Sequence, residues 1–146
     1  MKKNGHITAF YLETLLLIVV FIGIILILTQ VFGLGRVQSV EAKRLTNSVT
    51  LAANAAEAFS AAEEPAELLA FLNENGNAAA LPDTLGVTAR YDADMRPDPA
   101  GELRVDVCCT VEENSLVQGH IQVFRQGAEA PVYELETAAL WKEVSP

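Results

Sequence analysis

The apolar stretch over residues 10–34 constrains this chain most, because it contains a block, residues 15–28, that only Gly23 interrupts. As an α-helix of 25 residues, the stretch would extend roughly 37 Å, enough to cross a hydrocarbon core of about 30 Å. Fifteen Leu, Ile, Val or Phe side chains lie in residues 15–32. They contribute an insertion free energy of roughly −7 kcal/mol before polar penalties. The stretch therefore predicts a membrane-spanning helix over residues 6–35.

A secretory signal peptide is the alternative interpretation of the same stretch. Lys2 and Lys3 would form its basic region, but the apolar run is too long and no A-x-A cleavage site follows it. We therefore expect the helix to be retained as an anchor.

The charges of the chain are divided unevenly about this helix. Residues 36–146 hold eight Lys or Arg against eighteen Asp or Glu, a net charge of −10, whereas Lys2 and Lys3 make the amino end basic. Short basic tails tend to stay in the cytoplasm, so the amino terminus is expected inside and the acidic remainder outside, although Arg36, Lys43 and Arg44 weaken the asymmetry. The acidic balance also argues against a nucleic-acid partner.

The helical pattern continues beyond the membrane segment. From Arg36 no Pro occurs until Pro65, and apolar residues recur at steps of three and four, the spacing of one helical face. The face consists of Leu45, Val49, Ala52, Ala56 and Phe59, and the opposite positions are Lys43, Asn47, Asn54 and Glu57. One helix from about Ile7 to Ala62 is therefore predicted, with residues 36–62 amphipathic.

The residues after this helix change from helical spacing to alternation. Pro65 suits the first turn of a short helix over residues 65–74, which Asn75 and Gly76 would end, and residues 77–86 form a connection. Alternating apolar residues then predict four antiparallel strands over residues 87–141, with Glu113, Asn114 and Ser115 at a tight turn. The inward faces comprise Val87, Ala89, Tyr91 and Ala93; Leu103, Val105, Val107, Cys109 and Val111; Val117, Gly119, Ile121 and Val123; and Tyr133 and Leu135.

These elements predict an α+β fold in which the amphipathic part of the long helix covers one face of a four-stranded antiparallel sheet. Residues 36–146 would form the single domain outside the membrane.

The order of these parts resembles that of type IV pilins and pseudopilins. That family has a short basic leader ending in Gly, an apolar helix with an embedded Glu, an amphipathic continuation and an antiparallel sheet. Residues 1–5, MKKNG, look like the leader, and Glu13 is the embedded acid. In pilins the leader is cleaved after its Gly, and the mature chain usually has Phe or Met at its first position and Glu at its fifth. Counted from the same point here, His6 is first and Glu13 is eighth. The TadE-like relatives of pilins, whose Gly and Glu spacing is similarly loose, are an equally good comparison.

The resemblance implies that a prepilin peptidase cleaves between Gly5 and His6. It further implies a bacterial membrane protein that assembles with sister or related subunits of a pilus-like or type II secretion-like machine. The alternative is an uncleaved single-pass protein whose small acidic outer domain binds a protein partner.

Glu13 has two interpretations within this framework. It could lie near the lipid interface as a solvated or protonated acid. It could instead pair with the terminal amine of a neighbouring subunit and set the axial register of an assembly. Gly23, Gly33 and Gly35 would permit bending or close helix packing, but Gly is also common in membrane helices.

The remaining chemically notable residues favour no enzyme, cofactor or metal site. Cys108 and Cys109 are adjacent in a predicted strand, so they point to opposite faces and only Cys109 should be buried. His120 falls on an outward face with Gln118 and Gln122. The acids near strand ends lack the spacing of a Ca²⁺ loop and are expected to be solvated, namely Asp92, Asp94, Asp98, Glu112, Glu113 and Glu129.

Overall fold

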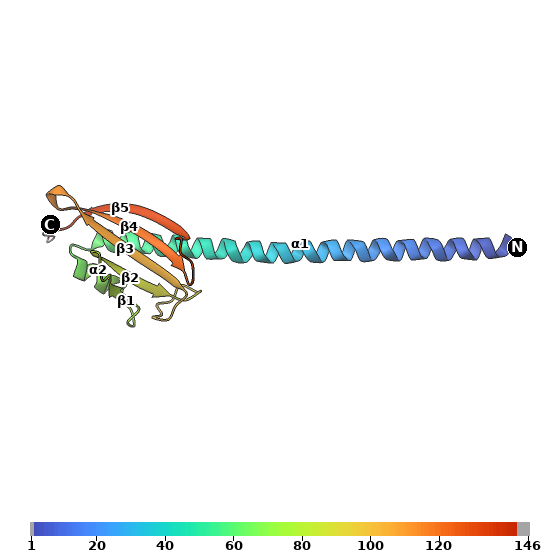
Figure 1. Ribbon diagram of the computed structural model, residues 1–146, viewed down its shortest axis with the longest axis horizontal. Helices are drawn as coiled ribbons and strands as arrows, with labels where there is room; N and C mark the ends of the chain where they lie inside the picture. The colour runs from blue at the N-terminus through green and yellow to red at the C-terminus, as the bar shows by residue number, and fades with distance from the viewer. Residues whose placement is uncertain (1, 143–146) are drawn as a thin grey trace. The chain divides into compact units, whose positions relative to one another are not determined.

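A computed structural model describes residues 2–142, and the side chains of residues 5–142. The fold is α+β, with one long amino-terminal helix, a short second helix and a five-stranded antiparallel sheet of order β1-β2-β3-β4-β5 (Figure 1). The elements are α1 (Lys2–Ala61), α2 (Pro65–Leu72), β1 (Ala78–Ala80), β2 (Gly86–Tyr91), β3 (Leu103–Val111), the 3-10 turn η1 (Glu113–Ser115), β4 (Leu116–Arg125) and β5 (Tyr133–Leu140).

The helix α1 is a continuous α-helix, as the sequence predicts, but it starts at Lys2 rather than near Ile7. Gly5 and His6 therefore lie in helical backbone, and so do Gly33 and Gly35. Met1 and the side chains of the lysines in the leader-like segment lie outside the described residues. The flexibility expected at the glycines and the cleavage after Gly5 remain predictions.

The chain separates into two compact units, residues up to Ala42 and residues from Lys43 onward. The first unit consists of α1 alone. The second unit contains the rest of α1, α2 and the sheet, and it holds the hydrophobic core.

The core forms where residues 43–61 of α1 pack against one face of the sheet, as expected. Leu51, Ala52, Ala55 and Phe59 are buried on the helix side. Inward side chains of the three central strands belong to the same cluster, namely Val87, Ala89, Leu103, Val105, Val107, Cys109, Val117, Ile121 and Val123. In β3 the buried and half-buried residues alternate from Leu103 to Cys109, which confirms the predicted pattern.

The predicted buried face of α1 is confirmed at Ala52 and Phe59 but wrong at Leu45 and Val49. Leu45 and Val49 are 49% and 37% exposed, whereas Asn47 and Ser48 are 8% and 1% exposed. The two polar residues are tolerated inside because both have hydrogen-bond partners. Asn47 Nδ2 donates to the carbonyl of Ala93 at 3.0 Å, and Ser48 Oγ donates to the carbonyl of Arg44 at 2.9 Å.

The prediction of four strands is also wrong, because β1 lies within the segment expected to be a connection. Ala78 pairs with Ala89 and Ala80 pairs with Val87, which adds a fifth strand beside β2. Three consecutive alanines carry no alternation of apolar and polar residues, so the sequence pattern does not reveal this strand. The pairing is set by backbone hydrogen bonds, including Leu81 N to Gly86 O at 3.0 Å.

The local turn predictions are confirmed, but the predicted end of α2 is wrong. Pro65 occupies the first turn of α2, and Asn114 and Ser115 have the positive φ angles of a tight turn. The helix α2 ends at Leu72, two residues earlier than predicted. Asn75 and Gly76 have left-handed φ angles of 59° and 78°, but they lie in the turn before β1 rather than at the end of the helix.

Candidate functional site

The first unit presents a helix whose apolar side chains are exposed on every side. From Ile7 to Val40 the large apolar residues are between 46% exposed, at Ile25, and 74% exposed, at Phe32. Among the described residues, this is the one helix long and apolar enough to cross a membrane. Apolar area of this extent must be covered by lipid or by other protein. The helix is thus compatible with a single-pass membrane anchor.

Some polar side chains of this helix form hydrogen bonds within the helix, and others do not. Thr14 Oγ1 donates to the carbonyl of Phe10 at 2.9 Å, and Thr29 Oγ1 donates to that of Ile25 at 2.8 Å. Glu13 makes no hydrogen bond or ion pair with any described residue. A carboxylate in an apolar environment needs a cation, a donor or a proton. Glu13 is therefore the group in this helix that most requires something from outside it.

The glycines of the helix are not required by packing within the chain. A Cβ atom added at Gly23, Gly33 or Gly35 would meet nothing within 4 Å. Packing within the chain therefore does not explain these glycines.

The second unit also leaves one side of α1, made of small and apolar residues, largely uncovered. Leu45, Val49, Ala53, Ala56 and Ser60 follow steps of three and four, so they share one side of the helix. Leu45, Val49, Ala53 and Ser60 are exposed, and Ala56 is half-buried. We refer to these five residues as the outer stripe of α1.

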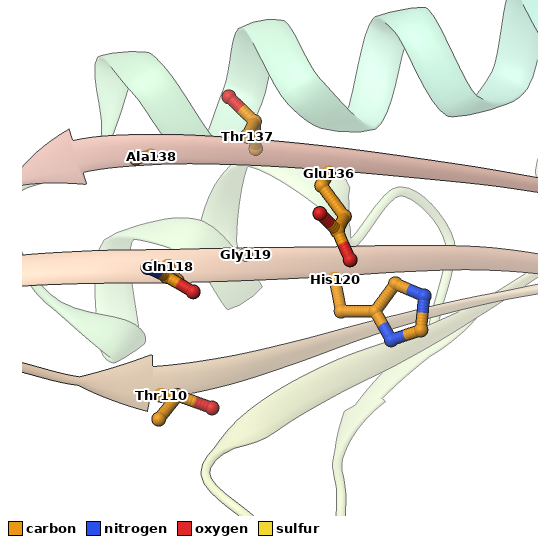
Figure 2. A pocket seen from close by; sticks show the side chains of 7 residues that line it. All are labelled: Thr110, Gln118, Gly119, His120, Glu136, Thr137 and Ala138. Carbon is orange, nitrogen blue, oxygen red and sulfur yellow. The ribbon is translucent and has the colours of Figure 1, made fainter.

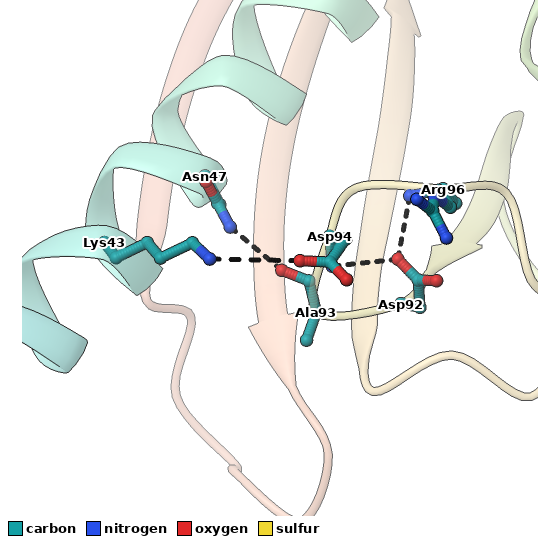
Figure 3. A network of polar contacts seen from close by, with 6 residues as sticks. All are labelled: Lys43, Asn47, Asp92, Ala93, Asp94 and Arg96. Atoms are coloured by element: carbon teal, nitrogen blue, oxygen red, sulfur yellow. Dashed lines mark hydrogen bonds and ion pairs between the residues drawn. The ribbon is translucent and has the colours of Figure 1, made fainter.

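The acidic loop between β2 and β3 folds against α1 (Figure 3). The Asp92 carboxylate accepts hydrogen bonds from the backbone N–H groups of Asp94 and Arg96, both at 2.9 Å. Lys43 Nζ lies 3.9 Å from Asp94 Oδ1. Within the described part of the chain, no three His, Cys, Asp or Glu side chains are grouped so that they could hold a metal ion. The loop acids that have partners thus shape the turn and hold it on the helix, together with Asn47.

The two cysteines lie on opposite faces of β3, as predicted. Cys109 is buried. Its burial, and to a smaller extent the charge of the neighbouring Cys108, raise the pKa of its thiol to about 12. Cys108 is half-buried. Its burial, and to a smaller extent the charge of Asp106, raise the pKa of its thiol as well. Both are free thiols held in the protonated form at neutral pH.

His120 lies on the outer face of the sheet, as predicted, at a shallow depression of about 360 Å³ (Figure 2). Its Nε2 atom is 4.0 Å from Glu134 Oε2. The depression is lined by Thr110, Gln118, Gly119, His120, Glu136, Thr137 and Ala138, from three strands. Sequence reasoning did not find it because strand pairing brings these residues together, and no local pattern signals it.

Comparison with known proteins gives no relative, because no family model, no curated protein and no solved structure matches this chain.

Proposed function

We propose that this chain is a membrane-anchored structural subunit or minor component of a pilus-like or type II secretion-like assembly, built through its amino-terminal apolar helix. The observation that carries the proposal is the exposure of the apolar side chains of α1 from Ile7 to Val40 on all sides. Lipid would cover this surface in the membrane, and the helices of sister subunits would cover it in an assembly. The amino terminus would lie in the bacterial cytoplasm and the second unit outside the cell membrane.

The outer stripe supports assembly more specifically than the membrane segment does. A helix that serves only as an anchor needs no exposed apolar residues once it has reached the folded unit. Leu45 and Val49 are nevertheless exposed in the second unit, on helix surface that the sheet does not cover. Small and apolar side chains along one side of a helix allow another helix to approach closely.

The alternative function is an uncleaved single-pass protein whose acidic outer domain binds a protein partner. The observation in its favour is the departure of His6 and Glu13 from the usual pilin positions. Under this alternative the outer stripe would stay exposed to water.

Crosslinking between copies tests the proposal. In a background with Cys108→Ser and Cys109→Ala, one new cysteine is placed at Val49 in the outer stripe or at Asn54, which is exposed on another side of α1. We expect a thiol crosslinker to join copies in native membranes through Val49→Cys much more than through Asn54→Cys. Equal crosslinking at the two positions, or none at either, would contradict assembly through this side of the helix.

The intact mass of the protein separates the two functions independently. When a compatible prepilin peptidase is co-expressed, the subunit should lose residues 1–5 and begin at His6. A full-length product would remove the pilin-like interpretation and favour the anchored partner-binding protein.

A further inference from the structure

The edge strand β5 presents an unused row of backbone hydrogen-bonding groups. β5 is the last strand of the sheet, and within the described residues no strand pairs with its outer edge. The N–H of Trp141 donates to the carbonyl of Ser115 at 3.0 Å. With the register of the two strands, this bond shows that the odd-numbered residues of β5 form the backbone hydrogen bonds to β4. Alternate residues of an antiparallel strand direct their backbone groups to opposite edges. The N–H and C=O groups of Glu134, Glu136, Ala138 and Leu140 therefore point to the free edge.

This edge has only one of the usual protections against pairing, the charge of its glutamates. Native edge strands are shortened, interrupted by Pro or bulges, covered, or given charged side chains. The opposite edge strand, β1, has only three residues. β5 has eight residues and no Pro, and its two glutamates alternate with the half-buried residues that face the helix, so their charges point outward.

The strand is also held in place at both ends. The N–H of Val132 donates to the carbonyl of Val123 at 2.7 Å, and Trp141, directly after the strand, is 1% exposed. A partner that pairs with β5 thus meets an ordered template and pays little of the entropy of ordering it.

The charges on β5 favour a basic partner. β5 carries Glu134 and Glu136 and no Lys or Arg. Glu134 already accepts a hydrogen bond from Gln122 Nε2 at 2.9 Å, whereas Glu136 is exposed and has no hydrogen bond or ion pair within the described residues. In a paired strand, the side chain opposite Glu136 would have its Cβ within about 5 Å of that of Glu136, and opposite charges at such positions attract.

The depression on the outer face offers room for a long cationic side chain. Ala138 and Glu136 line it from β5, and Gln118 lines it from β4 (Figure 2). Gln118 Nε2 donates to Glu112 Oε1 at 2.6 Å, which places a second carboxylate beside the depression. A Lys or Arg side chain that passes over the small Ala138 would meet Glu136. Backbone bonds along an edge give affinity, and pockets for alternate side chains give specificity.

We propose that β5 binds an extended segment of another protein by strand addition, and that this segment carries Lys or Arg at alternate positions facing Glu136. A second copy of β5 fits poorly, because it would bring the same glutamates to the seam and like charges there repel. This interaction goes beyond the assembly of α1 and does not depend on it.

Hydrogen exchange on the full chain tests the proposal. The protein is placed in phosphatidylcholine nanodiscs, which carry no net charge, and an end-capped nonapeptide of alternating Lys and Val is added as the probe. We expect slower exchange at the outward amides of Glu136 and Ala138 and unchanged exchange at the inward amides of Leu135 and Thr137. A peptide of alternating Glu and Val is the control and should have no effect.

Two pairs of variants separate backbone pairing from charge. Ala138→Pro removes an N–H that faces the free edge of β5 and should abolish binding, whereas Ala80→Pro, on β1 at the opposite edge of the sheet, should bind normally. Glu136→Lys should weaken binding about tenfold or more, and Glu136→Gln should weaken it less. The amides of β3 report whether each variant is folded, and Glu136→Lys remains a test if Ala138→Pro is not.

Four results would overturn the proposal. The outward amides could stay unprotected with the basic peptide, or the acidic peptide could protect them equally. Folded Ala138→Pro could bind as well as the wild type. Finally, protection that grows with protein concentration in the absence of peptide would show that a second copy occupies the edge.

Discussion

Glu13 is the side chain at which an anchor and an assembling subunit would differ most. An acid at the lipid interface tolerates loss of its charge, whereas an acid paired with a neighbouring amine does not. Thr14, its neighbour, is satisfied by its own helix through the bond to Phe10 at 2.9 Å. Glu13 and Thr14 are therefore a matched test position and control, because Glu13 needs an external partner and Thr14 does not.

We predict that Glu13→Ala leaves membrane insertion intact or improves it, because removing a carboxylate lowers the insertion penalty. The same change should abolish incorporation into assemblies, and Thr14→Ala should affect neither property. The measurement is crosslinking between sister subunits relative to the amount of protein in the membrane fraction. Unchanged crosslinking of Glu13→Ala at equal membrane abundance would leave Glu13 as an interfacial acid.

The second prediction at this scale concerns the two thiols. The thiolate is the reactive form, and a pKa of about 12 leaves about one part in ten thousand of Cys109 ionised at pH 8. In the Cys108→Ser variant, iodoacetamide should label the remaining Cys109 only after unfolding. In the Cys109→Ala variant, the half-buried Cys108 should be labelled in the folded protein. Mass spectrometry of each variant gives the labelled fraction, and rapid labelling of folded Cys108→Ser would contradict the buried position.

The folded-state pKa of Cys109 also sets a direction for stability against pH. Its thiol ionises near its ordinary value of 9.0 when the chain is unfolded and near 12 when it is folded. Protons are therefore released on unfolding in that range, so the contribution of Cys109 to stability is complete below pH 9 and is lost as the pH rises toward 12.

At the scale of single elements, the contact of α1 with the sheet depends most on Phe59. Its side chain is fully buried, and its ring lies so close to Gly119 on β4 that an added Cβ there would be 3.0 Å from Phe59 Cε2 and Cζ. A glycine at this point of a strand is explained by the close approach of the ring.

We predict that Phe59→Ala lowers the free energy of unfolding of the second unit by about 3–5 kcal/mol, since a buried aromatic leaves a cavity when truncated. Phe71→Ala is the matched control, because Phe71 on α2 is 51% exposed. It should change the stability by about 0.5 kcal/mol or less. Thermal melting followed by circular dichroism compares the two, and similar melting temperatures would show that Phe59 does not hold the helix on the sheet.

The elements also show what the sequence could reveal and what it could not. The long helix, α2 and four of the strands were predictable because each has its own periodicity over many residues. The strand β1 was not, because its three alanines carry no alternation of apolar and polar residues. The buried Asn47 was not, because its partner is distant in sequence. Asn47 is accepted in the interior through a bond to Ala93, 46 residues away. The outer depression and the free edge of β5 likewise follow from the order of the strands, which no local pattern contains.

At the scale of the whole molecule, the exposed apolar part of α1 and the hydrophobic core belong to different units. The apolar side chains of residues 43–61 that face inward are covered by the sheet of the same chain. Folding of the second unit should therefore not require the first.

We predict that a fragment of residues 36–146 folds by itself as a soluble monomer. Its circular dichroism spectrum should contain both helix and strand, and it should unfold cooperatively, because one core includes both elements. Size-exclusion chromatography with light scattering gives its mass in solution. Aggregation or an unfolded spectrum would contradict the independence of the second unit.

The buried position of Trp141 makes the protein its own spectroscopic reporter. It is the sole tryptophan of the chain, its ring lies 5.0 Å from that of Phe59, and its Nε1 donates to the Phe59 carbonyl at 3.3 Å. When tryptophan is excited selectively, the fluorescence therefore comes from the contact between α1 and the sheet and not from the apolar part of α1. The emission maximum should lie at short wavelength while α1 is packed on the sheet and shift to longer wavelength when the two separate, even in native membranes.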